Sequence, residues 1–284
     1  MRRQPVSNVL MVHCVAVLLV LAGCGEASGQ QSSAQPAAAL SFEVASIKRN
    51  MSGNGGYVRI EPGARFNAVG ATVMLILRQA YGVQSFSVVN LPAWATNEGY
   101  DIIAKAPDGI EAAPNMAALL RGLLKDRFGL VAHAETREMP TYDLVLARPD
   151  RKLGDGIQPA TVDCAARTAG TPPPQSPSGE ALCGITGGPS RLQVRGYAMS
   201  RVAGILAGTV QRAVIDKTEL AGPWNLDVRF APDQPAVVDG AVVPPSDAPS
   251  LFTAIQEQLG LRLARSRGPV EVLVIDRLSR PTSD

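Results

Sequence analysis

Apolar residues recur at intervals of three and four in four segments of this chain, which is the spacing of a helix that buries one face. The stretches between these segments alternate apolar and polar residues, as strands with one buried face do. The pattern therefore predicts a protein built from both helices and strands. The predicted helices cover residues 73–81, 116–127, 199–210 and 251–259.

The residues at the helix ends predict where the helices start and stop. Thr72 precedes the first helix and can accept a hydrogen bond from its first turn, whereas Ala198, which precedes the third helix, cannot. The second and fourth helices are each followed by a glycine, Gly129 and Gly260, that suits a left-handed C-cap.

The same order of elements occurs twice along the chain. Residues 65–70 (RFNAVG) are echoed 126 positions later by residues 191–196 (RLQVRG), and each precedes a helix. Strand-like stretches follow at 100–107 and 224–232, and the second is one residue longer, which suggests a bulge. Each half then closes with two predicted strands that turn near a proline, at 130–136 and 141–147 in the first half and at 261–266 and 270–276 in the second.

We predict an α+β fold of two similar units, each an antiparallel or mixed sheet with two helices packed on it. The units are expected at residues 41–148 and 191–284. Residues 149–190, between them, contain seven prolines and seven glycines, which is typical of a linker.

Residues 1–23 have the features of a signal peptide. Arg2 and Arg3 precede an apolar run of 15 residues, 9–23, which is shorter than the about 20 residues that a membrane-spanning helix needs. The run ends in LAGC, where Cys24 is the cysteine.

The LAGC sequence resembles the lipobox of bacterial lipoproteins, in which the cysteine is acylated and becomes the first residue. The alternative is that Cys24 merely follows an ordinary secretory signal. Gly25 rather than aspartate comes next, which favours an outer-membrane or periplasmic location over retention at the inner membrane.

Charge and composition limit the partners of the exported chain. Residues 24–40 are rich in Gly, Ser, Gln, Ala and Pro, which predicts a flexible tether. Removal of residues 1–23 leaves equal numbers of basic and acidic side chains, so nothing favours nucleic acid as a partner. We expect membrane contact through the N-terminal lipid, and either an envelope protein or a small molecule as ligand.

The remaining cysteines, Cys164 and Cys183, are predicted to form a disulfide, because an exported pair meets an oxidising compartment. Metal ligation and redox chemistry are the alternatives. Metal ligation lacks partner residues, since His13 and His133 are the only histidines, and redox pairs usually lie closer in sequence. We therefore expect neither a metal nor another cofactor.

Several segments of the chain together carry a resemblance to a known family. They include FEVASIK (42–48), DRFGL (126–130), HAETRE (133–138), SLFTAIQEQLGL (250–261) and GPVEVLVID (268–276). These segments resemble one uncharacterised exported family, found in many paralogous copies in Acidobacteria of the Solibacter type, and the resemblance extends from residue 41 to 281. It implies no activity and no catalytic residues, although some members resemble fusions to BlaR-type metallopeptidase sensors, which indicates sensing or interaction outside the cytoplasm.

One group of polar residues could carry chemistry. On a strand, His133, Glu135 and Arg137 would share a face, where they could form a polar binding or proton-transfer site, or a solvated ion network, which we favour. Asp101 is a further carboxylate that could serve His133, or could anchor a turn. No nucleophile motif accompanies them, so no catalytic residue is predicted.

Two tryptophans complete the candidate site residues. Trp94 and Trp224 each follow a proline turn and could floor a ligand groove, although core packing is the more common role of such residues. The sequence as a whole favours a lipid-anchored binding or interaction module of the cell envelope. An envelope hydrolase that uses His133 with a nearby carboxylate is the alternative.

Overall fold

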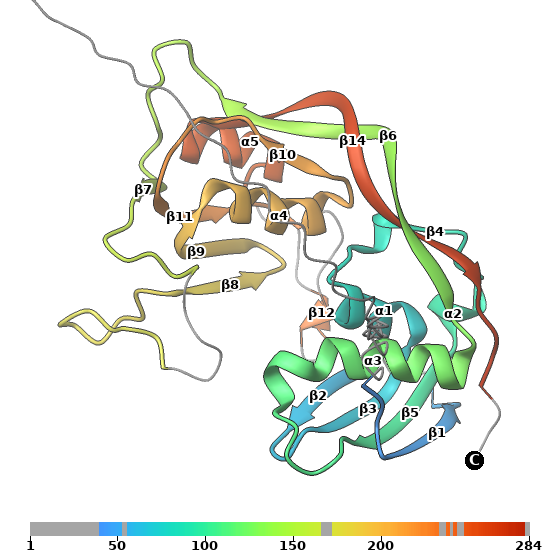
Figure 1. Ribbon diagram of the computed structural model, residues 1–284. Coiled ribbons are helices and arrows are strands. Elements are labelled where there is room, and N and C mark those ends of the chain that lie inside the picture. The colour runs from blue at the N-terminus through green and yellow to red at the C-terminus, as the bar shows by residue number, and fades with distance from the viewer. Residues whose placement is uncertain are drawn as a thin grey trace, which may run out of the picture. The chain divides into compact units, whose positions relative to one another are not determined.

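The computed structural model has a mixed α+β fold, as the sequence predicts (Figure 1). It describes residues 40–52, 56–165, 172–232, 237–238, 241–242 and 247–281. The described residues belong to one compact unit, Ala39–Asp284, and form five α-helices and several sheets. The cysteine expected to be acylated, Cys24, lies outside the described residues.

The first lobe consists of a four-stranded antiparallel sheet and two helices that cover one of its faces (Figure 1). Alternate residues such as Phe66 and Ile102 point toward the helices and are fully buried. The strand order is β1-β5-β3-β2, from β1 (Val44–Asn50), β2 (Tyr57–Glu61), β3 (Arg65–Thr72) and β5 (Gly99–Lys105), and the helices are α1 (Val73–Tyr81) and α3 (Ala112–Phe128).

The predicted helix ends of the first lobe are confirmed. Thr72 Oγ1 accepts a hydrogen bond from the amide of Leu75 at 3.3 Å. Gly129 follows α3 with a φ of 60°, a left-handed conformation that glycine adopts without steric cost.

The second lobe has a sheet of the same size and its own hydrophobic core. Met199 and Leu206 of one helix and Ile255 of another pack in this core against Val194 and Leu226 of the sheet. The strand order is β7-β11-β9-β8, from β7 (Ile157–Pro159), β8 (Gly184–Gly188), β9 (Arg191–Ala198) and β11 (Pro223–Arg229). The helices are α4 (Met199–Val210) and α5 (Leu251–Ala254), which continues into the π-helical turn η2 (Ile255–Leu259).

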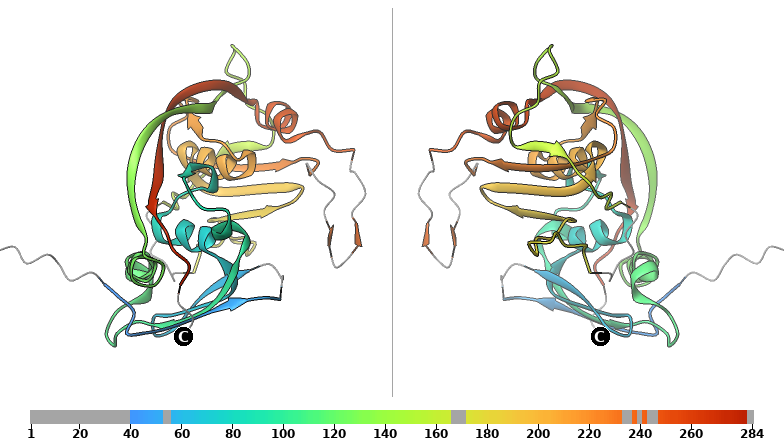
Figure 2. Two further views of the ribbon diagram at one scale, coloured as in Figure 1. Left: turned by 90° about the vertical axis from the view of Figure 1, so that its right-hand side faces the viewer. Right: turned by 90° about the vertical axis from the view of Figure 1, so that its left-hand side faces the viewer.

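Two long antiparallel strands, here called the ribbon, connect the lobes (Figures 1 and 2). They are β6 (Val131–Leu146) and β14 (Leu261–Arg277). Leu144, near the end of β6, lies in the second core, and Ile275, near the end of β14, lies in the first core. Each half of the chain therefore contributes its last strand to the hydrophobic core of the other half.

Two short strands extend the ribbon in matching places. Val88 and Val89 of β4 pair in parallel with Leu273 and Val274 of β14. Val214 of β10 (Val214–Asp216) pairs in parallel with Tyr142 of β6.

The smaller elements are η1 (Ser85–Ser87), α2 (Trp94–Asn97), β12 (Val237–Val238) and β13 (Ala241–Val242).

The expected turns near Pro140 and Pro269 are wrong, because β6 and β14 run through both prolines without interruption. At each proline the strand has a neighbour on one side only, since β10 begins opposite Tyr142 and β4 opposite Leu273. A proline in such a position can leave its missing N–H on the open side, so no hydrogen bond of the sheet is lost.

The segment expected to be a linker, residues 149–190, contributes β7 and β8 to the second sheet. The glycine-rich β8 (GITGG) carries no alternation from which a strand could be predicted. The predicted bulge also lies elsewhere. The extra residue is in β9, opposite the step from Trp224 to Leu226, and not in β11.

Candidate functional site

The outer face of the second sheet is polar, because alternate residues of its two central strands point away from the core. Leu192 and Val194 of β9 and Leu226 of β11 are buried among the helices. The residues between them, such as Gln193 and Asp227, point to the other side and are partly exposed. This face carries the candidate site.

Three adjoining hollows form a groove on this face, which we call the sheet groove. The first has a volume of about 250 Å³. A second of about 280 Å³ shares Glu180, Gln193 and Arg195 with it, and a third of about 450 Å³ shares Asp155, Gly156 and Asp227. The first hollow is lined by Asp155, Gly156, Gln158, Glu180, Gln193, Arg195, Asn225, Leu226 and Asp227.

A network of hydrogen bonds fixes the floor of the sheet groove. Asp227 accepts hydrogen bonds from Arg191, through Nε at 2.8 Å and through Nη2, and from Gln193 Nε2 at 3.0 Å. The hydrogen bonds from Arg191 lower the pKa of Asp227 and, in return, raise the pKa of Arg191. Asp227 therefore remains charged at neutral pH and holds both side chains in place.

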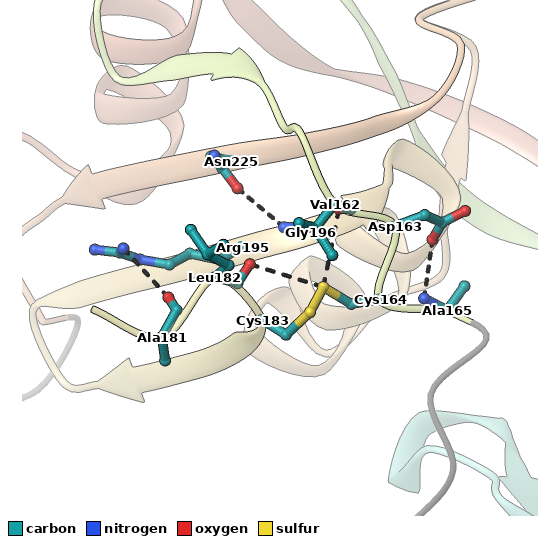
Figure 3. Close-up of a disulfide and its surroundings, with 10 residues drawn as sticks. All are labelled: Val162, Asp163, Cys164, Ala165, Ala181, Leu182, Cys183, Arg195, Gly196 and Asn225. Carbon is teal, nitrogen blue, oxygen red and sulfur yellow. Dashed lines mark hydrogen bonds between the residues drawn. A yellow bond between two sulfur atoms is a disulfide. The ribbon is translucent and has the colours of Figure 1, made fainter. Parts of the chain in front are cut away.

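Glu180, Ala181 and Cys183 form one wall of the sheet groove. Figure 3 shows the disulfide of Cys183 beside Ala181 and Arg195. Cys164 and Cys183 are at disulfide distance, as predicted, with 5.7 Å between their Cα atoms. Arg195 reaches from the floor to this wall, where its Nη1 lies 3.4 Å from the carbonyl oxygen of Ala181 and 3.5 Å from Glu180 Oε2. The disulfide thus holds two wall residues beside the groove floor.

Asp101 has a structural role in the first sheet. Its Oδ1 accepts hydrogen bonds from Asn50 Nδ2 at 2.7 Å and from the amide of Gly70 at 2.8 Å. Gly70 is the bulged residue of β3 and has a φ of 60°. Asp101 thus stabilises a bulge in the first sheet, whereas His133 lies on the ribbon.

Asn225 stabilises a bulge in the second sheet, as Asp101 does in the first. Its Oδ1 accepts the amide of Gly196 at 3.0 Å, and Gly196 has a φ of 77° at the bulge of β9 (Figure 3). Asn225 also lines the sheet groove, so it links the backbone of the bulge to the candidate binding surface.

His133, Glu135 and Arg137 lie on β6, and His133 is half exposed. Arg137 donates a hydrogen bond to Glu135 at 2.8 Å, and this bond lowers the pKa of Glu135. His133 Nδ1 lies 2.8 Å from Oδ2 of Asp276 on β14. Asp276 comes two residues after Val274, which is the cross-strand partner of His133. Asp276 could not be identified from the sequence, because only the register of the two strands brings it to the imidazole.

Neither tryptophan lines the sheet groove. Trp224 is 8% exposed in the second core and donates from Nε1 to the carbonyl oxygen of Ala221 at 3.1 Å. Trp94, at the start of α2, packs edge-on against Tyr100 and lies beneath the guanidinium of Arg280, 5.1 Å from the centre of its ring system.

The residues of the sheet groove were missed by sequence reasoning. The alternation in residues 191–195 and 225–229 does carry a signal, because polar residues alternate there with buried apolar ones. Such alternation marks any solvated sheet face. The hollow itself depends on the wall, whose residues Glu180 and Ala181 lie 15 and 14 positions before Arg195 of the floor.

Membrane-spanning helices and clusters of metal-binding side chains are both absent from the residues that the structure describes. In that part of the chain, no helix is both long and apolar enough to cross a bilayer. The same residues bring together no group of three or more His, Cys, Asp or Glu side chains that could hold a metal ion.

The fold and the groove define an α+β protein whose two lobes share a long β-ribbon and whose second sheet presents a polar concave surface. The chain belongs to the family described as a protein of unknown function (DUF3738), whose model matches residues 74–278. The match begins in α1 and ends just beyond β14, so it includes the ribbon and the sheet groove.

The other comparisons add little. The chain is 40% identical over 67 residues to the RuvB subunit of the Holliday junction branch migration complex from a Nocardioides species. This alignment covers 23% of the chain and 19% of that protein, so the chain spans about a fifth of the length of the curated relative it matches. No solved structure matches the chain.

Proposed function

We propose that this protein is a non-enzymatic binding module of the cell envelope, and that the sheet groove binds its ligand. The observation that carries the proposal is the groove itself. Its floor presents the amide of Gln193, the carboxylate of Asp227 and the guanidinium of Arg195, and each is held by hydrogen bonds within the protein, so they can receive a polar ligand without further ordering.

The residues around the sheet groove favour binding over catalysis. The residues that line its three hollows include no histidine, serine or tyrosine, and the one cysteine among them, Cys183, is in the disulfide. Thr186 is the one hydroxyl residue among them, and no histidine or lysine lines the groove to serve as its base. Hydrogen-bonding side chains and paired charges are suited to recognition of a small polar molecule or a polar segment of an envelope protein.

The experiment that tests this function measures ligand retention by native mass spectrometry after incubation with an envelope extract. Gln158→Leu combined with Arg195→Leu should abolish the retained mass, because these changes remove hydrogen-bonding groups that line the groove. Arg59→Leu, on the exposed face of the first sheet, is the matched control and should retain it. Equal retention by both variants would show that the groove is not the binding site.

The location in the envelope is part of the same proposal. The LAGC sequence supports acylation of Cys24, after which residues 24–40 would tether the lobes to the outer membrane or to the periplasmic side of a membrane. Replacement of Cys24 with serine should release the protein from the membrane fraction and abolish labelling by a fatty acid. Unchanged membrane retention would contradict the anchor.

We also infer that the two lobes arose by internal duplication. The order β1-β5-β3-β2 corresponds to β7-β11-β9-β8, with the first and last strands in equivalent places. The bulges at Gly70 and Gly196, and the pairing of β4 and β10 with equivalent parts of the ribbon, support the same conclusion. The Solibacter-type resemblance and its sensor fusions agree with a role in recognition.

A second candidate function is an envelope hydrolase that uses His133. The contact between His133 Nδ1 and Asp276 would orient the imidazole as a general base. Both side chains are about half exposed, at 53% and 42%, so water would weaken their coupling. Hydrolysis of ester or peptide substrates by the wild type, lost in His133→Gln, would support this function over the binding module.

A further inference from the structure

A second cavity lies where the two lobes meet at the ribbon, and we call it the junction cavity. It has a volume of about 190 Å³ and lies apart from the sheet groove, with which it shares no residue. Four separate segments line it. They contribute Phe86 from η1, Met139 and Pro140 from β6, Val270 from β14, and Gln211, Arg212 and Ala213 from the connection between α4 and β10.

The lining of the junction cavity is mostly apolar. Five of its seven residues, Phe86, Met139, Pro140, Ala213 and Val270, present only carbon and sulfur side-chain atoms. A pocket with an apolar body and a few polar groups is the usual form of a small-molecule site. The volume is below the 300 Å³ or so typical of drug-sized ligands, which limits the occupant to a small compound.

Arg212 is the one charged residue among the seven that line this cavity. Its guanidinium lies 4.9 Å from the centroid of the Tyr142 ring, which holds the side chain in place through a cation–π contact. Among the described residues, no carboxylate forms an ion pair with Arg212. An oriented, half-buried guanidinium without an acidic partner is complementary to an anion, and its planar fork fits a carboxylate.

The backbone beside Arg212 is unusual. Gln211 ends α4 with a φ of 49°, a left-handed conformation that is costly for a residue with a side chain. The equivalent helix of the first lobe, α1, ends instead at Gly82. Strain of this kind is often found at ligand sites, where it fixes the direction of neighbouring groups.

We propose that the junction cavity binds a small organic monocarboxylate with an aromatic or branched aliphatic body. The apolar body would pack against Phe86, Met139 and Val270, and the carboxylate would pair with Arg212. Because the lining comes from both lobes and from the ribbon, such a ligand would stabilise their contact. This site is independent of the sheet groove and of the lipid anchor.

The test measures the dissociation constants of phenylacetate and of its neutral analogue phenylacetamide by isothermal titration calorimetry. The wild type should bind phenylacetate more tightly, and Arg212→Gln should weaken phenylacetate by about tenfold or more while leaving phenylacetamide unchanged. Val270→Phe, which fills the cavity, should weaken both compounds. Arg201→Gln, on the exposed side of α4, and Arg195→Leu, in the sheet groove, should change neither.

Circular dichroism and thermal unfolding of each variant show whether it is folded, so a loss of binding by an unfolded protein is recognised as such. Three results would overturn the proposal. They are equal affinity for the carboxylate and the amide, unchanged phenylacetate binding by folded Arg212→Gln, and no binding of either phenylacetate or 3-methylbutanoate by the wild type at millimolar concentration. None of these results would affect the proposed function of the sheet groove.

Discussion

Asp101 and Asn225 occupy the same place in two different sheets. Asp101 Oδ1 accepts the amide of Gly70 at 2.8 Å, and Asn225 Oδ1 accepts the amide of Gly196 at 3.0 Å. In each case a side chain on one central strand satisfies the amide of a bulged glycine on the next. The two residues share a carbonyl-type oxygen but differ in charge, so the oxygen is what the bulge requires.

This relationship predicts different outcomes for two substitutions at Asp101. Asp101→Asn keeps an acceptor and should leave stability nearly unchanged, whereas Asp101→Ala leaves the Gly70 amide without its partner and should cost about 1–3 kcal/mol. Urea denaturation measures both. Equal destabilisation by the two variants would mean that the charge of Asp101, rather than the hydrogen bond, supports the sheet.

Gly196 should tolerate no side chain. Its φ is 77°, and an added Cβ would overlap Cys164 Sγ and lie 2.8 Å from the carbonyl oxygen of Val162. We expect Gly196→Ala to destabilise the protein by more than about 1 kcal/mol, because backbone strain and steric overlap add. Gly187→Ala in β8 is the control, since nothing lies within 4 Å of its added Cβ. The difference in urea midpoint between the two variants measures the effect.

Loss of the disulfide should weaken both the fold and the sheet groove. The bond joins residues 19 positions apart, and a loop of this length is expected to contribute about 3 kcal/mol. Cys164→Ser combined with Cys183→Ser should lower the melting temperature and, because Glu180 and Ala181 lose their fixed position, should also weaken ligand retention by the groove. Retention equal to that of the wild type would show that the wall does not contribute to binding.

Asp227 should contribute to stability in a limited pH range. Hydrogen bonds from Arg191 lower its pKa below the ordinary value of 3.8, so the folded state holds the proton less tightly than the unfolded state. This contribution is fully present above the unfolded pKa and is lost as the pH falls through the lower, folded pKa. Asp227→Asn should therefore flatten the loss of stability below pH 3.8, measured by denaturation at a series of pH values. An unchanged acid profile would contradict the linkage.

Each half of the chain contributes its last strand to the core of the other half, so we predict that neither half folds alone. Leu273 and Ile275 of β14 are buried in the first core, at 5% and 4% exposure, so residues 40–148 without β14 would leave that core open. We expect this fragment to show no cooperative thermal transition, in contrast to residues 40–281. A cooperative transition of the isolated fragment would contradict the shared core.

Local patterns in the sequence predicted the elements of the fold well. The spacing of apolar residues identified α1, α3, α4 and the helix that begins at Leu251, and Thr72, Gly129 and Gly260 marked their ends. These features depend on residues within one or two helical turns of each other, so the sequence contains them directly. The disulfide was predictable for a different reason, since only two cysteines remain after Cys24.

The arrangement of those elements depends on contacts between distant residues. The continuity of β6 through Pro140, the pairing of β6 with β14 and the entry of β7 and β8 into a sheet follow from the neighbours available to each strand. The register of the ribbon also brings Asp276 to His133, 143 residues away, and leaves Asp101 in another sheet.

The sequence by itself determined the helices and their ends, because side-chain periodicity and backbone preference act over a few residues. It determined the cysteine pair because only Cys164 and Cys183 remain after Cys24. Only the tertiary structure decided the pairing of β6 with β14 in the ribbon, the sheet groove and the junction cavity. These features depend on burial and hydrogen bonding between strands that are far apart in the chain. Such contacts form, and contribute to stability, only in the folded protein.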